Sequence, residues 1–281
     1  MADPALERPA LEKPALERIV RRDRVVVAVS LGLLTVVAWA YVLWLADDMD
    51  MSGMDMTGTR MMSTALGLVL PASAPWRLVE FAFVFVMWLV MMVGMMAPSA
   101  APMILMYARA GRHAAASGAP FAPAGWFVAG YFLAWTGFSL AATLVQWALE
   151  RLALLNADMA SASQVVGGVV LVVAGAYQWT PLKDVCLTQC QTPLGFLMRY
   201  GGFRRDPLGS LQLGLRHGAF CVGCCWALMA LLFVVGVMNV LWIALLAVLV
   251  LLEKVMPQGR LVARFAGAAF IASGAYLLVQ A

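Results

Sequence analysis

The fold class is decided by residues 81–107, which read FAFVFVMWLVMMVGMMAPSAAPMILMY and contain no charged side chain. A transmembrane helix needs about 20 consecutive apolar residues, and this stretch is longer than one crossing requires. Pro98 and Pro102 interrupt it near its far end, where we expect a kink or a break. The stretch therefore predicts a membrane-spanning helix.

The composition of the whole chain supports a membrane protein. Apolar residues make up 63% of the 281 residues, and charged residues make up only 12%. Because an average soluble domain carries about 25% charged residues, a soluble chain this apolar could not cover its surface. The net charge of +4 comes without a basic stripe or a nucleic-acid motif, so we expect no nucleic-acid partner.

Further apolar runs predict an all-α, polytopic transmembrane helical bundle of about seven spans over residues 25–281. Residues 1–24 are predicted to form a disordered cytoplasmic tail. They contain three copies of Pro-Ala-Leu-Glu followed by a basic residue, and proline at every fifth position prevents a continuous helix. The predicted spans are residues 25–45, 76–107, 122–148, 163–180, 216–237, 239–254 and 261–280.

The basic residues predict the orientation of the bundle. Seven spans place four basic segments on one side, which the positive-inside rule makes cytoplasmic. The N-terminus then lies inside, and the acidic loop at 46–75 and the C-terminus lie outside. We expect a multi-pass protein of a bacterial inner membrane. The four segments are Arg21 to Arg24, Arg109 with Arg112, the group from Lys183 to Arg216, and the group from Lys254 to Arg264.

One imidazole and three thiols occur together in HGAFCVGCCWALM, residues 217–229. On a helix, the four side chains share an arc of roughly 100°. The predicted orientation puts them at the cytoplasmic end of their span. Thiolates and imidazole suit Cu(I), zinc or an iron–sulfur cluster, but free cysteines can equally be small buried apolar residues. The candidate ligands are His217, Cys221, Cys224 and Cys225.

A second pair of thiols follows Thr180-Pro181, which has the pattern of an N-cap with proline at the first helical position. A short helix from residue 181 would place Cys186 and Cys190 one turn apart on one face. The predicted side of the membrane is the same as for the thiols after His217, so the two groups could complete one site. Reduced thiols are expected there, and not a structural disulfide.

Methionines form two further candidate groups. In the span at 76–107 they recur at helical spacing, and thioethers bind Cu(I), although methionine also fills irregular helix contacts. In the outer loop they alternate with aspartates and could collect copper, with a flexible polar linker as the alternative. The candidate ligands are Met91, Met92, Met95 and Met96 in the span and Met51, Met54 and Met56 in the loop.

Three segments resemble the bacterial family of predicted metal-binding integral membrane proteins, a domain of unknown function. They are MWLVMMVGMMAPS at 87–99, the segment from Tyr177 through Cys186 to Pro193, and the segment from Gly214 through CVGCCW to Met229. The resemblance covers about residues 76–280. It implies a helical membrane fold and a metal site, and it implies no particular reaction.

We interpret the chain as a membrane protein that binds and handles a soft metal ion. Cu(I) is the leading ion and zinc the alternative. The protein would transfer the ion, sequester it, or deliver it to a metallochaperone or a membrane complex. Two other functions stay open: a membrane thiol/quinone redox protein, and a scaffold or assembly subunit with a structural metal. No nucleotide-binding loop, Ser-His-Asp order or H-E-x-x-H helix occurs, so the sequence gives no support to hydrolase or kinase chemistry and indicates no catalytic residues.

Overall fold

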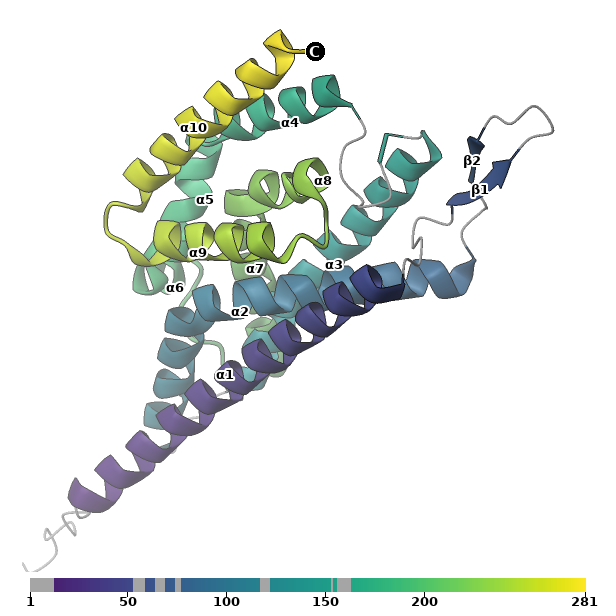
Figure 1. Ribbon diagram of the computed structural model, residues 1–281. Helices are drawn as coiled ribbons and strands as arrows, with labels where there is room; N and C mark the ends of the chain where they lie inside the picture. Colours follow the sequence, from purple (N-terminus) through teal and green to yellow (C-terminus); the bar gives the residue numbers. More distant parts are fainter. Residues whose placement is uncertain are drawn as a thin grey trace, which may run out of the picture.

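The computed structural model describes residues 13–52, 59–63, 69–73, 77–116, 122–152, 154–155 and 163–281. This part of the chain is a bundle of helices with one two-stranded hairpin (Figure 1). The prediction of a helical protein is confirmed, and the antiparallel hairpin lies within the loop predicted at 46–75. The elements are α1 Lys13–Ser52, β1 Thr59–Ser63, β2 Val69–Ser73, α2 Leu78–Ala116, α3 Ala124–Arg151, α4 Gln164–Tyr177, α5 Pro181–Gln191, α6 Pro193–Arg199, α7 Pro207–Ala230, α8 Leu232–Val235, α9 Val240–Val255 and α10 Gly259–Val279.

Helix α1 begins at Lys13, so residues 13–24 of the predicted tail belong to a helix. Pro14 stands in the first helical turn, where its missing N–H has no intrahelical partner to lose. Residues 1–12 lie outside the described residues. Helix α1 packs along α2, and a Cβ on Gly94 would come within 3.1 Å of the Ala38 Cβ. The small residue at that position lets the two helices approach closely.

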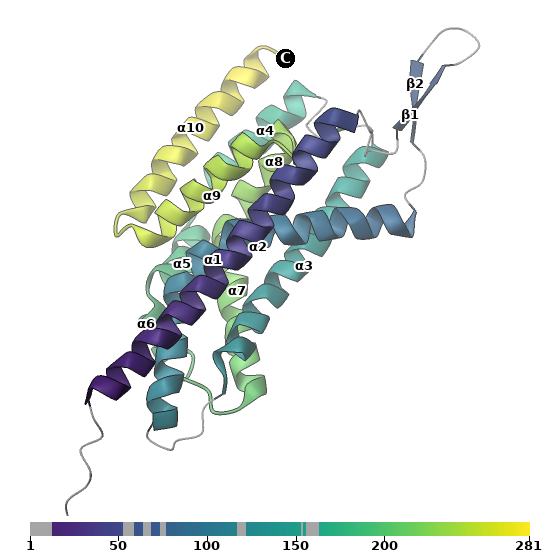
Figure 2. The ribbon, with the colours of Figure 1, turned by 60° about the horizontal axis from the view of Figure 1, so that its bottom comes forward.

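Helix α2 runs unbroken through Pro98 and Pro102. A proline removes one hydrogen bond of the helix and pushes away the carbonyl four residues earlier, which bends the helix. Figure 2 shows α2 changing direction along its course. Of the two outcomes expected from the sequence, the structure shows the kink. The bend also directs the two arms of α2 toward different neighbours in the bundle (Figure 2).

Two helix pairs pack backbone against backbone. A Cβ on Gly214 of α7 would lie 2.0 Å from the carbonyl oxygen of Phe127 in α3. A Cβ on Gly175 of α4 would lie 2.6 Å from the carbonyl oxygen of Gly267 in α10. Only glycine fits at such contacts, which are typical of helix interfaces in membranes. The α3–α7 contact therefore fixes the position of α7, the helix that carries three of the thiols.

Five of the described helical segments are long and apolar enough to cross a membrane, and α4 with α5, bent by 63°, makes a sixth if the pair is one span. Helices α4 and α9 have 14 and 16 residues. At 1.5 Å per residue they reach about 21 and 24 Å, less than the roughly 30 Å of a hydrocarbon core. The count of seven spans and the orientation therefore stay predictions. The start of α1 and the C-terminus lie at opposite ends of the bundle (Figure 2).

Helix α7 begins earlier than the sequence predicted. Its N-cap is Asp206, whose carboxylate accepts a hydrogen bond from the Gly209 N–H at 2.6 Å, and Pro207 is its first residue. The apolar segment that includes α7 runs over Pro207–Val235, so Cys221 stands 14 residues from each end (221 − 207 and 235 − 221). The sequence predicted the thiols near the start of a span at residue 216, whereas the helix starts nine residues earlier (216 − 207), so the thiols lie near the middle of this apolar segment. Their place relative to a membrane stays a prediction.

Candidate metal centre

The sulfur of Cys221 is the atom on which side chains from four helices converge. Lys254 of α9 donates to it at 2.9 Å, and the hydroxyl of Tyr131 of α3 lies 3.0 Å away. Three further thiols lie within hydrogen-bonding reach of the same sulfur. We call this group the Cys221 cluster. It consists of Cys221, Lys254, Tyr131, Cys190, Cys224 and Cys225.

The helical repeat of α7 places three of these thiols on one buried face. Cys224 and Cys225 follow Cys221 by three and four residues, which are the positions directly one turn later. Their thiols both donate to the Cys221 carbonyl oxygen, at 3.1 and 3.0 Å. Side chains that point back toward the preceding turn bring their sulfur atoms toward that of Cys221. All three residues are at most 2% exposed.

Helix α5 brings the fourth thiol. The predicted cap is present: the Thr180 hydroxyl accepts a hydrogen bond from the Lys183 N–H at 3.3 Å, and Pro181 is the first helical residue. From this start, Cys190 reaches Cys221 and Cys224 across the α5–α7 interface. Cys186, one turn earlier, lies against the backbone of α7: a Cβ on Gly223 would be 2.9 Å from its sulfur. The two cysteine groups therefore meet in space.

His217 occupies an aromatic pocket one turn before Cys221. Its ring centroid lies 5.0 to 5.9 Å from the centroids of Phe196, Tyr131 and Phe127. The side chain is 3% exposed, and its Nδ1 has no hydrogen-bond partner among the described residues. A buried nitrogen without a partner can still ligate a metal. The aromatic contacts are packing interactions that the sequence analysis did not anticipate.

The methionines of α2 divide into two kinds. The four candidates are at most 2% exposed and belong to the hydrophobic core, which is the packing role expected of methionine. Met96 also borders the Cys221 cluster, because its sulfur lies 3.9 Å from the Lys254 Nζ. The methionines predicted to bind copper in the outer loop cannot be placed: the side chain of Met51 and the whole of Met54 and Met56 lie outside the described residues. Buried together in the core are Met91, Met92, Met95 and Met96.

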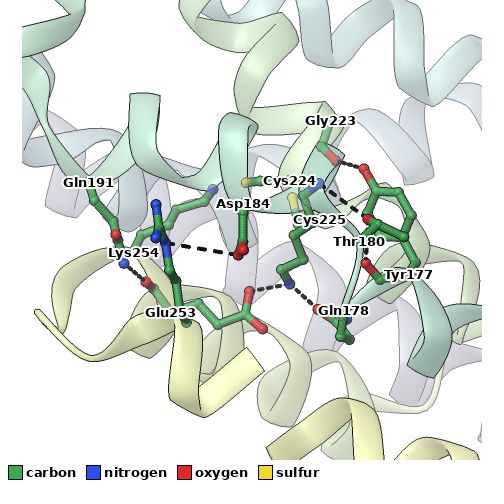
Figure 3. Close-up of polar contacts among 12 residues, drawn as sticks. Tyr177, Gln178, Thr180, Asp184, Gln191, Gly223, Cys224, Cys225, Glu253 and Lys254 are labelled. Atoms are coloured by element: carbon green, nitrogen blue, oxygen red, sulfur yellow. Dashed lines mark hydrogen bonds and ion pairs between the residues drawn. The ribbon is translucent and has the colours of Figure 1, made fainter. Parts of the chain in front are cut away.

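Two lysines that the positive-inside count assigned to loops are buried. Lys183 is 0% and Lys254 6% exposed, so neither charge informs the orientation. Lys183 donates to Glu253 at 2.7 Å and to the side-chain oxygen of Gln178. Figure 3 shows Gln178 and Glu253 facing each other within this network. The sequence did indicate Glu253 and Lys254 as candidate functional residues, because ionisable residues that end an apolar run are often functional. Nothing in the sequence around Tyr131 indicated that its hydroxyl lies beside Cys221.

Ligand geometry limits the kind of centre that the cluster could form. Across the described ranges, no group of three or more His, Cys, Asp or Glu side chains is arranged to hold a metal ion. All five cysteines are free thiols. A structural zinc site normally takes four such ligands, whereas a pair of soft sulfur ligands suits Cu(I). A nearby cavity of about 410 Å³, lined by Phe138, Trp226, Phe233 and other apolar side chains, offers no ligand of this kind.

A comparison with protein families fits this sulfur chemistry. A family model described as PpoB2, a copper chaperone, matches residues 85–277, which is more than half of the chain. The chain belongs to the PpoB2 copper-chaperone family. No curated protein and no solved structure matches the chain. PpoB2 membership supports copper handling in general and gives no support to the zinc alternative.

The PpoB2 match separates the candidate ligands into two sets. It contains the whole Cys221 cluster, His217 and the methionines of α2. Helix α1, the hairpin and the candidates Met51, Met54 and Met56 precede residue 85, where the match begins. The matched range therefore includes the Cys221 cluster and leaves out the outer loop.

Proposed function

We propose that this PpoB2-family chain binds Cu(I) within a membrane and passes it to a partner. The observation that carries the proposal is the convergence on Cys221. Cys190, Cys224 and Cys225 each interact with the Cys221 thiol, and the Met96 thioether lies 3.9 Å from the Lys254 Nζ. Thiolates and thioethers are the ligands that select Cu(I) over harder ions. Copper is here the cargo of the protein, in agreement with its family.

The ion is bound by Cys221 and a second thiol of the cluster. Cys190, Cys224 and Cys225 all reach the Cys221 sulfur, so the second ligand can change without a large movement of the helices. Such exchange suits transfer, because an ion that moves between neighbouring thiols is never released to water. The cluster has no carboxylate among its members, which disfavours Mg²⁺, Ca²⁺ and other hard ions.

The position of Cys221 supports a role inside the bilayer. It stands at the middle of a segment long enough to cross a membrane, with 14 residues on either side. No ATPase motif occurs in the chain, so delivery depends on a partner or on the copper gradient. We place the protein in the bacterial inner membrane, with Met51, Met54 and Met56 collecting the ion outside and a metallochaperone or membrane complex as the other partner.

Metal content of the purified protein tests this function. The parent and Cys221→Ser are purified in detergent under anaerobic reducing conditions, loaded with Cu(I) and analysed by mass spectrometry. We expect near-stoichiometric copper in the parent and a loss of most of it in Cys221→Ser. Cys186→Ser is the matched control, since Cys186 is a thiol of the same interface outside the cluster, and it should retain copper. A copper-free parent, or a Cys221→Ser protein with full copper, overturns the proposal.

A further inference from the structure

The Lys254 ammonium is bound by sulfur and hydroxyl atoms. An ammonium group has three N–H donors. Its contacts are the Cys221 sulfur at 2.9 Å, the Ser99 hydroxyl at 3.2 Å and the Met96 sulfur at 3.9 Å. Among the described residues, no carboxylate forms an ion pair with it, because the neighbouring Glu253 pairs with Lys183. The polar atom closest to the Lys254 ammonium is therefore the Cys221 sulfur.

We infer that Lys254 is the counter-cation of the copper complex, a residue that sets how tightly the Cys221 cluster binds Cu(I). This inference rests on the proposed function. One Cu(I) ion and two thiolates together carry a single negative charge. Burying a net charge in an apolar interior is costly unless an opposite charge lies beside it. The Lys254 ammonium provides that charge at the sulfur of the cluster and leaves the complex neutral as a whole.

The other cations of this region are already paired or lie elsewhere. Lys183 is neutralised by Glu253 at 2.7 Å. Arg260 and Arg264 are about half exposed and lie 3.9 and 3.8 Å from the Asp184 carboxylate. Within the part of the chain that the structure describes, Lys254 is thus a cation in direct contact with the Cys221 sulfur and without a carboxylate partner. Its single charge matches the single charge of a two-thiolate complex.

Met96 and Ser99, on either side of Pro98 in α2, both contact the ammonium. Ser99 lies next to Pro98, and its hydroxyl donates to the Met96 carbonyl oxygen at 2.9 Å while it accepts from Lys254. The Tyr131 hydroxyl lies 3.4 Å from the same carbonyl and 3.0 Å from the Cys221 sulfur. A hydrogen-bonded arrangement thus links α2, α3, α7 and α9 around one charge pair. Lys254 acts on copper through this position and is not itself a ligand.

Three substitutions at position 254 separate charge from hydrogen bonding. Lys254→Met removes both, Lys254→Gln keeps a hydrogen-bond donor without the charge, and Lys254→Arg keeps the charge. Cu(I) affinity is measured in detergent by competition with a coloured Cu(I) chelator, and folding is checked by gel filtration. We expect Lys254→Met and Lys254→Gln to bind Cu(I) at least about tenfold more weakly than the parent. Lys254→Arg should stay within a few fold of the parent.

The matched control is Arg264→Gln, which removes a positive charge that is about half exposed and lies 3.8 Å from the Asp184 carboxylate, away from the cluster. It should bind Cu(I) like the parent. If Lys254→Gln keeps the parent affinity, the charge is not needed and the inference is wrong. If Lys254→Met does not fold, the inference is tested by comparing the Cu(I) affinities of Lys254→Gln and Lys254→Arg. A parent that binds no Cu(I) overturns the proposed function itself, whereas parent-like affinity in the uncharged variants overturns only the role of Lys254.

Discussion

Lys183 of α5 and Glu253 of α9 form an ion pair of 2.7 Å in which the side chains are 0% and 1% exposed. The pair ties together two helices that each contribute to the Cys221 cluster, α5 through Cys190 and α9 through Lys254. Gln191 adds a second link, because its side-chain amide donates to the Glu253 carbonyl oxygen at 2.7 Å (Figure 3). The two helices therefore hold their side of the cluster as one unit.

Breaking this pair on one side should destabilise the protein. Lys183→Met leaves the Glu253 carboxylate buried and uncompensated, and such a loss typically costs about 3–5 kcal/mol of unfolding free energy. The double variant Lys183→Met/Glu253→Met leaves no charge behind and should be close to the parent. Thermal unfolding of the detergent-solubilised protein, followed by circular dichroism, measures both. Equal stability of the single and the double variant would show that a lone buried Glu253 carboxylate does not destabilise the fold.

The contact between α3 and α7 can be tested with one methyl group. Gly214→Ala places a Cβ 2.0 Å from the Phe127 carbonyl oxygen, so the two helices must separate. We expect a loss of about 1–3 kcal/mol, the usual range for overpacking. Gly137→Ala is the control, because nothing lies within 4 Å of its Cβ, and it should stabilise α3 by about 0.5–1 kcal/mol. The difference between the two unfolding temperatures is the measured quantity.

The methionines of α2 are predicted to differ in their effect on copper. Met96 borders Lys254 at 3.9 Å, whereas Met91 is a core residue for which the structure shows no polar contact within the described chain. Met96→Leu should weaken Cu(I) binding severalfold, and Met91→Leu should leave it unchanged. Both swaps keep the side-chain volume and should cost less than about 1.5 kcal/mol in stability. Copper loss in Met91→Leu as well would instead support a relay of thioethers along α2.

His217 is expected to contribute packing more than copper binding. Its ring lies among three aromatic rings, and phenylalanine has a similar shape. His217→Phe should therefore fold and retain nearly the copper content of the parent, measured by mass spectrometry as for Cys221→Ser. If copper is lost while the fold persists, the unpartnered Nδ1 is a ligand and the centre combines sulfur with nitrogen.

Local sequence patterns predicted the local parts of this centre. Thr180-Pro181 predicted the start of α5, and the spacing of the cysteines predicted their common face on α7. The start of α7 carried the same kind of signal in Asp206-Pro207, a capping residue followed by proline, and it was missed. Reading it would have placed the thiols near the middle of the apolar helical segment Pro207–Val235.

The long-range contacts could not be predicted from the sequence. Lys254 and Cys221 are 33 positions apart, and Tyr131 and Cys221 are 90 apart. No periodicity relates such pairs, since their meeting depends on how the helices pack. The burial of Lys183 was hidden for a related reason: in the sequence it stands in a connection rich in arginines, and only the fold covers it completely. Charge counting treats every lysine between spans as solvated, and that assumption fails here.

The glycine contacts between α3 and α7 limit the routes that we expect copper to take to the Cys221 cluster. Gly214 and Gly218 lie with their backbones against Phe127 and Tyr131, at separations that leave no room even for a methyl group. Backbones packed in this way leave no gap through which copper and its ligands could move, so we expect copper to approach the cluster from the side of α9, whose Lys254 meets Cys221. A partner that receives the ion is then expected to dock on that side.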